Sequence, residues 1–242
     1  MTITPGPREH LERIYDSLIA YYGEPKWEPD HDPLGGLIGT ILSQHTSDIN
    51  SGRAYQRLIE TFPAWEEVRD AQTNKVAEAI KSGGLANIKA PRIQNVLHTL
   101  TEWQQEQGGK DSLANFLNAE LKERPLEEAW HYLQQMPGVG PKTAACVLLF
   151  NLGRPLMPID THLHRLTHRL GLIGPKVSAN QAHTIFLKAL PPEWAYTLHV
   201  NLIQHGRTIC HAQRPKCGHC PLYAECAYVG SIDPQETMLP TK

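Results

Sequence analysis

Apolar residues recur at intervals of three and four along almost the whole chain, which is the spacing typical of amphipathic helices. The first such stripe covers residues 11–22, and no run alternates apolar and polar positions over the length of a strand. The pattern therefore predicts an all-α fold. Further helices are expected near 34–43, 48–61, 73–81, 90–107, 125–136, 141–150, 161–170, 178–189 and 193–205.

Two segments lack this periodicity. Residues 104–125 form the most polar part of the chain, and they predict an excursion over the surface. Residues from about 229 onward predict a loosely ordered tail.

The composition is that of a globular protein, with 40% hydrophobic and 20% charged residues. No stretch reaches the roughly 18 to 20 consecutive apolar residues that a membrane span needs. The first residues also lack the basic start and apolar run of a secretory signal. We therefore expect a cytoplasmic protein, associated with the nucleoid if its source is prokaryotic, that has no membrane partner.

Charge is distributed unevenly along the chain, whose net charge is −2. Residues 141–216 carry nine basic and two acidic side chains, whereas the remainder carries 14 basic and 23 acidic ones. A region with such a basic excess is suited to face phosphates. Chance composition is the alternative explanation.

Four of the five cysteines lie close together with the spacing C-x6-C-x2-C-x5-C (Cys210, Cys217, Cys220 and Cys226). In a chain of this size, such crowding predicts a metal or cluster site rather than a disulfide framework. Thiolates select soft metals, so zinc and an iron–sulfur cluster are both candidates. Zinc sites usually pair two short knuckles, whereas only Cys217 and Cys220 are closely spaced here. This favours a cluster with a structural role.

A glycine-rich segment, MPGVGPKTA (136–144), lies between two helical patterns. Gly138 and Gly140 permit positive φ, and the backbone N–H groups of a tight turn at the start of a helix form an anion site. The segment is typical of a helix–hairpin–helix, which grips DNA phosphates without reading sequence. A plain turn between two helices is the alternative.

Lys142 follows the hairpin directly, and Asp160 precedes the helix expected near 161–170. The positive end of the helix dipole favours the neutral amine of a lysine at that position, and the neutral amine is the species that forms Schiff bases. Asp160 is suited to be an N-cap, a catalytic carboxylate, or both.

These signals, in this order, resemble the endonuclease III family, the iron–sulfur branch of the helix–hairpin–helix DNA glycosylases. The resemblance covers nearly the whole chain and implies a 4Fe–4S cluster on the four cysteines. Its segments are ILSQHTSD (41–48), GLANIKA (84–90), LQQMPGVGPKTAACVL (133–148), PIDTHLHRL (158–166) and HGRTIC with the cysteines that follow it (205–226).

The resemblance implies a bifunctional glycosylase and abasic-site lyase of base excision repair. Its partner would be double-stranded DNA that contains oxidised pyrimidines or abasic sites. Lys142 then corresponds to the nucleophile that forms a Schiff base, and Asp160 to the family's essential carboxylate. Nothing in the sequence indicates obligate oligomerisation, so we expect a monomer.

The resemblance also implies DNA contacts. The loop 44–48 and Leu85 correspond to the elements that fill the gap left by a flipped base. His45 aligns with the family's penetrating glutamine and Gln44 lies beside it, so either of the two is a candidate to insert. The segment 101–125 is longer than in compact members, which makes it a candidate modifier of substrate range. Further contacts are expected from Gly138, Val139, Gly140, Arg207, Arg214 and Lys216.

The family fold implies two helical domains with a cleft between them. Residues 27–154 would form a six-helix barrel that contains the helix–hairpin–helix. Residues 1–26 and 155–242 would form an iron–sulfur cluster domain from both ends of the chain. Lys142 and Asp160 would face each other across the cleft.

Other functions on this fold stay open. Adenine-specific mismatch glycosylases share the cysteine spacing and the hairpin but lack the lysine found here at Lys142, and thymine-mismatch glycosylases tend to lack it too. A non-catalytic or weakly active lesion-binding iron–sulfur protein would need neither Lys142 nor Asp160. The presence of both residues favours the bifunctional enzyme.

Overall fold

The computed structural model describes residues 8–229, and every regular element in that range is a helix, which confirms the all-α prediction. The chain forms two compact units. The hairpin unit runs from Glu28 to Arg154, and the cysteine unit combines the described residues up to Trp27 with those from Pro155 onward. None of the helices described is long and apolar enough to cross a membrane.

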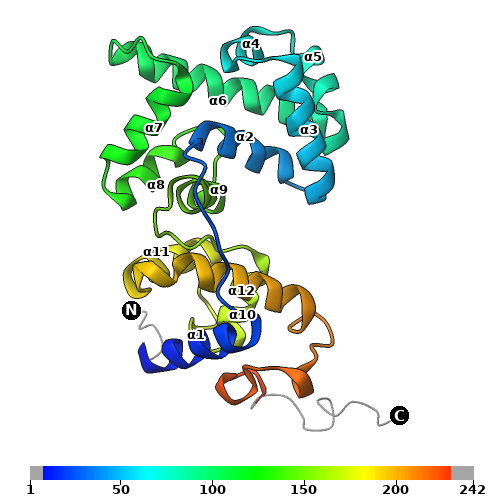
Figure 1. The fold of residues 1–242 in the computed structure, drawn as a ribbon, viewed down its shortest axis with the longest axis vertical. Coiled ribbons are helices and arrows are strands. Elements are labelled where there is room, and N and C mark those ends of the chain that lie inside the picture. The colour runs from blue at the N-terminus through cyan, green and yellow to red at the C-terminus, as the bar shows by residue number, and fades with distance from the viewer. Residues whose placement is uncertain (1–7, 230–242) are drawn as a thin grey trace. The chain divides into compact units, whose positions relative to one another are not determined.

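The hairpin unit is built around one apolar helix, α2, which Figure 1 shows among its neighbours. This helix packs against α3, α6, α7 and α9, and its apolar side chains are fully buried (Leu34, Leu37, Ile38, Ile41 and Leu42). A helix that is apolar on all sides belongs in a core. The helices of this unit are α2 (Pro33–Ser43), α3 (Asp48–Thr61), α4 (Trp65–Asp70), α5 (Thr73–Ala79), the 3-10 turn η1 (Lys81–Gly83), α6 (Ala86–Glu106), α7 (Leu113–Glu123), α8 (Leu126–Gln134), α9 (Pro141–Cys146) and the π-helical η2 (Val147–Asn151).

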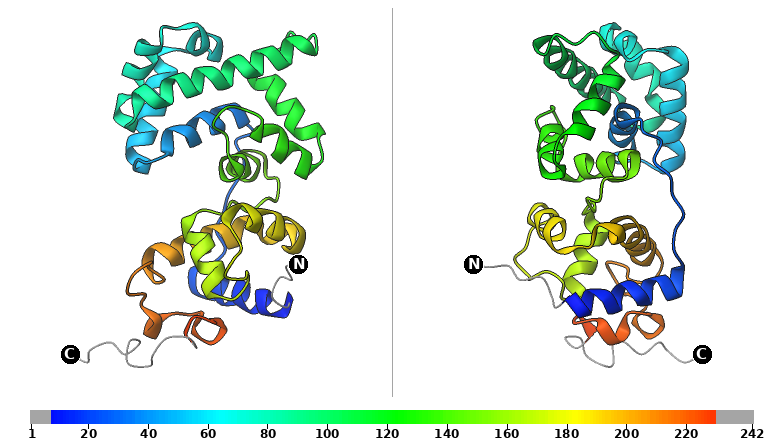
Figure 2. Two further views of the ribbon diagram at one scale, coloured as in Figure 1. Left: turned by 180° about the vertical axis from the view of Figure 1, so that it is seen from behind. Right: turned by 60° about the vertical axis from the view of Figure 1, so that its left-hand side comes forward.

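The cysteine unit joins the two ends of the sequence. Helix α1, drawn in blue, lies beside the orange and red segment that carries the cysteines in every view (Figures 1 and 2). Arg13 Nε on α1 donates a hydrogen bond of 3.0 Å to the Glu225 carboxylate, which fixes this pairing. The elements are α1 (Arg8–Tyr22), α10 (Thr161–Arg169), α11 (Ala179–Ala189), η3 (Pro192–Trp194), α12 (Ala195–Thr208), η4 (Cys217–His219) and η5 (Tyr223–Glu225).

The prediction of a surface excursion over 104–125 is wrong. Helix α6 continues to Glu106, and α7 places four apolar side chains in the core: Leu113, Phe116, Leu117 and Leu121. Their helical spacing is masked in the sequence by the polar residues on either side. The segment is therefore part of the core of the hairpin unit and not an appended loop.

Two further differences concern short-range signals. The helix expected from residue 90 begins at Ala86, so Pro91 lies inside α6 rather than at its start. Helix α4 was not predicted, because six residues are too few to show a periodic stripe. The predicted tail beyond residue 229 lies outside the described residues.

Candidate functional site

The glycine-rich segment forms a tight hairpin between α8 and α9. The Val139 N–H donates to the Met136 carbonyl oxygen at 3.1 Å, and Gly138 has a φ of +76°. Pro141 is the first residue of α9, and its carbonyl oxygen accepts a hydrogen bond of 2.9 Å from the indole of the buried Trp130. The two helices and the turn are thus held as a helix–hairpin–helix by hydrogen bonds of their own.

The three hairpin residues predicted to contact DNA are not equivalent. Val139 is only 5% exposed, and its N–H is already bonded within the turn. Gly138 is exposed and Gly140 is partly exposed. An anion at this hairpin would therefore meet the backbone at the two glycines rather than Val139.

Gly138→Ala should destabilise the hairpin. A Cβ at Gly138 would lie 2.8 Å from Arg92 Nε, and residues with a Cβ rarely adopt its φ of +76°. We expect a loss of about 1–2 kcal/mol in the free energy of unfolding, measured by chemical denaturation, together with weaker DNA binding. Gly140→Ala is the matched control for stability, because no atom lies within 4 Å of the Cβ it would add. Equal stability of the two variants would contradict the strain assigned to Gly138.

Lys142 is the second residue of α9, and its side chain is exposed. The residues that follow it, Thr143 to Leu149, are all buried. The amine is therefore presented from a helix end that is anchored in the core of the hairpin unit. Groups held on rigid elements are the ones that keep a catalytic geometry.

Two loop residues of the hairpin unit, His45 and Leu85, adopt left-handed backbone conformations, with φ of +55° and +50°. Such non-glycine residues are uncommon and gather at functional sites. Leu85 is 50% exposed at the start of α6, and His45 is exposed after α2. Gln44 is only partly exposed, because Arg92 Nη1 donates to its Oε1 at 2.8 Å. The two candidates therefore differ: the Gln44 side chain is bonded to Arg92, and the His45 side chain is exposed.

Asp160 is the N-cap of α10, and its Oδ1 accepts the Leu163 N–H at 2.8 Å. This cap fixes the orientation of the carboxylate. Capping uses one carboxylate oxygen, so the other is available to take up a proton or to stabilise a cation. Asp160 belongs to the cysteine unit and Lys142 to the hairpin unit.

Two buried histidines hold the backbone that leads into Asp160. His199 Nδ1 donates to the Pro158 carbonyl oxygen at 3.0 Å, and His183 Nε2 accepts the Ile159 N–H at 2.9 Å. The histidines are 6% and 1% exposed and come from α12 and α11. The segment before Asp160 is therefore fixed by two neighbouring helices.

The four cysteines lie in the cysteine loop, residues 210–226, at the end of α12. Arg169 Nη1 donates to Cys210 Sγ at 3.1 Å, and the Cys226 thiol lies 3.4 Å from the Arg169 carbonyl oxygen. Cys220 Sγ is 3.5 Å from His205 Nε2. A hydrogen bond donated to sulfur, as from Arg169 Nη1 to Cys210, stabilises thiolate charge.

His205 is 1% exposed, and burial lowers its pKa to about 4, so the imidazole is neutral at physiological pH. Its Nδ1 lies 2.9 Å from the Tyr22 hydroxyl. With the Tyr22 hydroxyl as donor to Nδ1, the ring proton is on Nε2 and points at the sulfur of Cys220. Helices α1 and α12 thus jointly support one cysteine of the loop.

The thiols themselves fit a soft cationic group. Burial raises the pKa of Cys220 to about 11, and burial followed by the charges of Cys210 and Cys226 raises the pKa of Cys217. Thiols whose ionisation is opposed in this way, as in Cys217 and Cys220, become thiolates when a cation binds. Over residues 8–229, no three His, Cys, Asp or Glu side chains converge as they would around a single metal ion. Four thiol donors suit a soft metal, either zinc or an iron–sulfur cluster.

The basic residues predicted beside the cysteines all have exposed side chains: Arg207 on α12, and Arg214 and Lys216 in the cysteine loop. None of them forms an ion pair within the described part of the chain. Arg214 has a φ of +50°, and the Lys216 N–H donates to the Ile209 carbonyl oxygen at 3.0 Å. These free cations suit contacts with phosphates.

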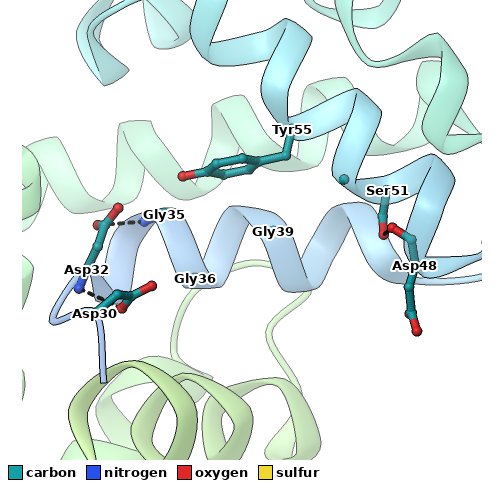
Figure 3. Close-up of a pocket in the computed structure, with 9 residues that line it drawn as sticks. Asp30, Asp32, Gly35, Gly36, Gly39, Asp48, Ser51 and Tyr55 are labelled. Atoms are coloured by element: carbon teal, nitrogen blue, oxygen red, sulfur yellow. Dashed lines mark hydrogen bonds between the residues drawn. The ribbon is translucent and has the colours of Figure 1, made fainter. Parts of the chain in front are cut away.

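A cavity of about 320 Å³ lies along α2 in the hairpin unit, with Asp30 and Asp32 at one end and Asp48 at the other (Figure 3). Burial, with the nearby Asp32 and Asp30 charges, raises the pKa of Tyr55 to about 12 and keeps this phenol neutral. Carboxylates repel a polyanion. This cavity is therefore not suited to contact a nucleic-acid backbone.

Two residues were not predicted from the sequence. Lys89 bonds to carbonyl oxygens at the ends of α2 and η1, and Arg92 contacts Gln44 and lies against Gly138. Lys89 lies on the same helical stripe as the buried Ile93, Val96 and Leu100. A lysine on the buried stripe of a helix was the signal that could have identified it.

Comparison with known proteins places the chain in a family. The model of the HhH-GPD superfamily base excision DNA repair proteins matches residues 38–192. Endonuclease III of Thermotoga maritima is 31% identical over 220 residues, which cover 90% of this chain and 92% of that protein. A protein of Arabidopsis thaliana that is named as a DNA glycosylase is 36% identical over 177 residues. This match covers 73% of the present chain and 57% of the plant protein.

The fold agrees with a solved structure of a trapped covalent intermediate of endonuclease III with DNA. The TM-score is 0.74 at 26% sequence identity, and the match covers 93% of this chain and 98% of the other. The chain therefore belongs to the endonuclease III family of DNA glycosylases, within the HhH-GPD superfamily of base excision DNA repair proteins.

Proposed function

We propose that this protein is a bifunctional DNA glycosylase and abasic-site lyase that removes oxidised pyrimidines from double-stranded DNA. The observation that carries the proposal is the exposed amine of Lys142, presented from the anchored start of α9 directly after the hairpin. A glycosylase that only activates water needs no amine at this position, whereas Schiff-base chemistry does.

In the proposed reaction the damaged base is first flipped out of the stack. The Lys142 amine attacks C1′ of the deoxyribose and the bond from C1′ to the base breaks. The base leaves with the bonding electron pair and takes up a proton, while the amine loses one. Asp160, oriented by its cap to Leu163, accepts the proton of the amine and stabilises the positive charge that develops on the sugar.

Opening of the C1′–O4′ bond then gives a protonated Schiff base on Lys142. Loss of a proton from C2′ is followed by departure of the 3′ phosphate, which cuts the strand on the 3′ side of the lesion. Water hydrolyses the Schiff base and restores the lysine. Each step needs only the amine, a carboxylate and water.

A duplex with one thymine glycol tests this proposal. We expect excision of the damaged base and strand cleavage 3′ to it without alkali treatment, followed on a denaturing gel. Excision that yields breaks only after alkali would indicate a monofunctional glycosylase. Binding of the duplex without excision would indicate a lesion-binding protein.

On the DNA, we propose that Leu85 and His45 enter the space left by the flipped base. Both are exposed on left-handed turns, whereas the amide of Gln44 is bonded to Arg92. The hairpin glycines and the basic residues near the cysteine loop would contact phosphates. In this assignment the hairpin unit is the helical barrel domain and the cysteine unit is the cluster domain.

We further propose that Cys210, Cys217, Cys220 and Cys226 hold a 4Fe–4S cluster. Four thiolates with no open ligand position give the cluster a structural role, that of closing the cysteine loop. Arg169 and His205 donate hydrogen bonds to two of the sulfurs. The closed loop then presents Arg214 and Lys216 toward DNA.

Cys217→Ser should remove the brown colour of the purified protein, together with its iron and acid-labile sulfide, because the cluster loses one of its four ligands. The cysteine loop should become sensitive to proteolysis. The matched control is Cys146→Ala, since Cys146 lies in the hairpin unit and its replacement should leave the colour intact. A colourless wild type that contains zinc would contradict the cluster.

A further inference from the structure

The hairpin unit buries a lysine that the proposed chemistry does not use. Lys89 on α6 is 2% exposed, and its Nζ donates to the carbonyl oxygens of Leu42 at 2.6 Å and Gly83 at 2.8 Å. No carboxylate pairs with it in the described part of the chain. The contacts of this ammonium are therefore two backbone carbonyls from the ends of two different elements, α2 and η1.

Both carbonyls lie just ahead of a residue that is proposed to enter DNA. Leu42 is in the last turn of α2, where carbonyls have no partner within the helix, and His45 follows it. Gly83 ends η1, and Leu85 follows it. One ammonium thus binds the backbone three residues before His45 and two residues before Leu85.

Arg92 extends this connection to the hairpin. It lies one turn beyond Lys89 on α6 and donates from Nη1 to Gln44 Oε1 at 2.8 Å. The same side chain packs against Gly138, where an added Cβ would lie 2.8 Å from Arg92 Nε. The first turns of α6 therefore contact the 44–45 loop, the 83–85 loop and the hairpin.

This arrangement is costly for a role in stability alone. A buried ammonium without a counterion carries a desolvation penalty, and apolar replacements of buried charges are often neutral or stabilising. Burial, with the nearby Arg92 charge, lowers the pKa of Lys89, which reflects that penalty. The gain is geometric, since one nitrogen atom joins the end of α2 to the end of η1.

We propose that Lys89 and Arg92 are positioning residues that hold both inserting loops and the hairpin in the arrangement that extrudes a base from the duplex. The inference rests on the proposed function, because it assigns a role in base extrusion. Lys89 and Arg92 act through His45, Leu85 and Gly138 and do not themselves touch the reacting atoms.

The first test separates extrusion from chemistry. Lys89→Met keeps the apolar stem and removes the ammonium, and Lys122→Met is the matched control because Lys122 is exposed on α7. The probe is a duplex with 2-aminopurine opposite a tetrahydrofuran abasic analogue, which the enzyme cannot cleave. Insertion should unstack the probe and raise its fluorescence with wild type and Lys122→Met, and the rise should be largely lost with Lys89→Met.

The second test compares two reactions of the same variant. Excision of thymine glycol from a duplex requires extrusion, and a small misplacement of groups should slow it about tenfold to a hundredfold in Lys89→Met. Cleavage of a single-stranded abasic site requires no extrusion, and its rate in Lys89→Met should stay within about threefold of wild type. Iron content and thermal unfolding are measured on the same samples.

Arg92→Met provides an independent variant if Lys89→Met folds poorly, because Arg92 is only partly buried. It should reduce the fluorescence rise as well. Arg92→Met and Gln44→Ala form a double-mutant cycle. The double variant should lose less of the fluorescence rise than the sum of the losses in the two single variants.

Three outcomes would overturn the inference. The first is a fluorescence rise equal to that of wild type in both Lys89→Met and Arg92→Met. The second is an equal loss of rate by Lys89→Met on the duplex and single-stranded substrates. The third is additive losses of the fluorescence rise in the cycle of Arg92→Met with Gln44→Ala. A wild type that raises fluorescence but processes neither substrate would instead contradict the proposed function. The non-cleavable probe therefore keeps the two failures distinguishable.

Discussion

Lys142→Gln should abolish strand cleavage at an abasic site while leaving DNA affinity within a few-fold of wild type. The amine is the proposed nucleophile, and glutamine cannot form a Schiff base, so the rate should fall on the order of a thousand-fold or more. The side chain is exposed at the start of α9, and its replacement removes no core contact. Single-turnover cleavage and equilibrium binding to a non-cleavable duplex provide the two measurements.

Lys110→Gln is the matched control, because Lys110 is an exposed lysine of the same unit in the turn between α6 and α7. It should cleave and bind as wild type does. If Lys142→Gln loses binding and cleavage to the same extent, Lys142 is a phosphate contact. If it still cleaves at the wild-type rate, another amine is the nucleophile.

Asp160→Asn should fold normally yet lose base excision. Asparagine caps helices about as well as aspartate, so the hydrogen bond to Leu163 is retained and the free energy of unfolding should change little. The amide cannot accept the proton of the amine or stabilise the cationic sugar as a carboxylate does. We expect single-turnover excision to slow by about 10² to 10⁴-fold.

Asp160→Ala separates the two roles of this carboxylate. It should lose excision to a similar extent and also about 1 kcal/mol of stability through the missing cap. Normal excision by Asp160→Asn would show that Asp160 acts only as an N-cap. Both variants should retain the brown colour, since the cysteines are unchanged.

The sequence predicted the helical fold well where apolar stripes were long and uninterrupted. It failed over 104–125, because the four core residues of α7 are surrounded by polar residues and only tertiary packing shows that they are buried. It also placed the start of α6 too late, near residue 90, whereas the helix begins at Ala86 and Pro91 lies inside it.

For the site, the motifs predicted that Lys142 lies at the start of a helix after a hairpin and that Asp160 is an N-cap. Both features are specified by neighbouring residues in the sequence. They could not show that His183 and His199 hold the segment before Asp160, or that Lys89 joins two loops. Those contacts join residues far apart in the sequence, and no local pattern encodes them. The proposal that His45 rather than Gln44 inserts likewise depends on Arg92, a contact made within the hairpin unit.

The most direct test of the central proposal is borohydride trapping of the wild-type protein on a duplex with one abasic site. Reduction converts a Schiff base into a stable covalent adduct, which a denaturing gel resolves from free protein. We predict a trapped adduct whose DNA is attached at Lys142. Absence of an adduct while the protein still binds the duplex would contradict the Schiff-base mechanism and leave a monofunctional or lesion-binding protein on the same fold.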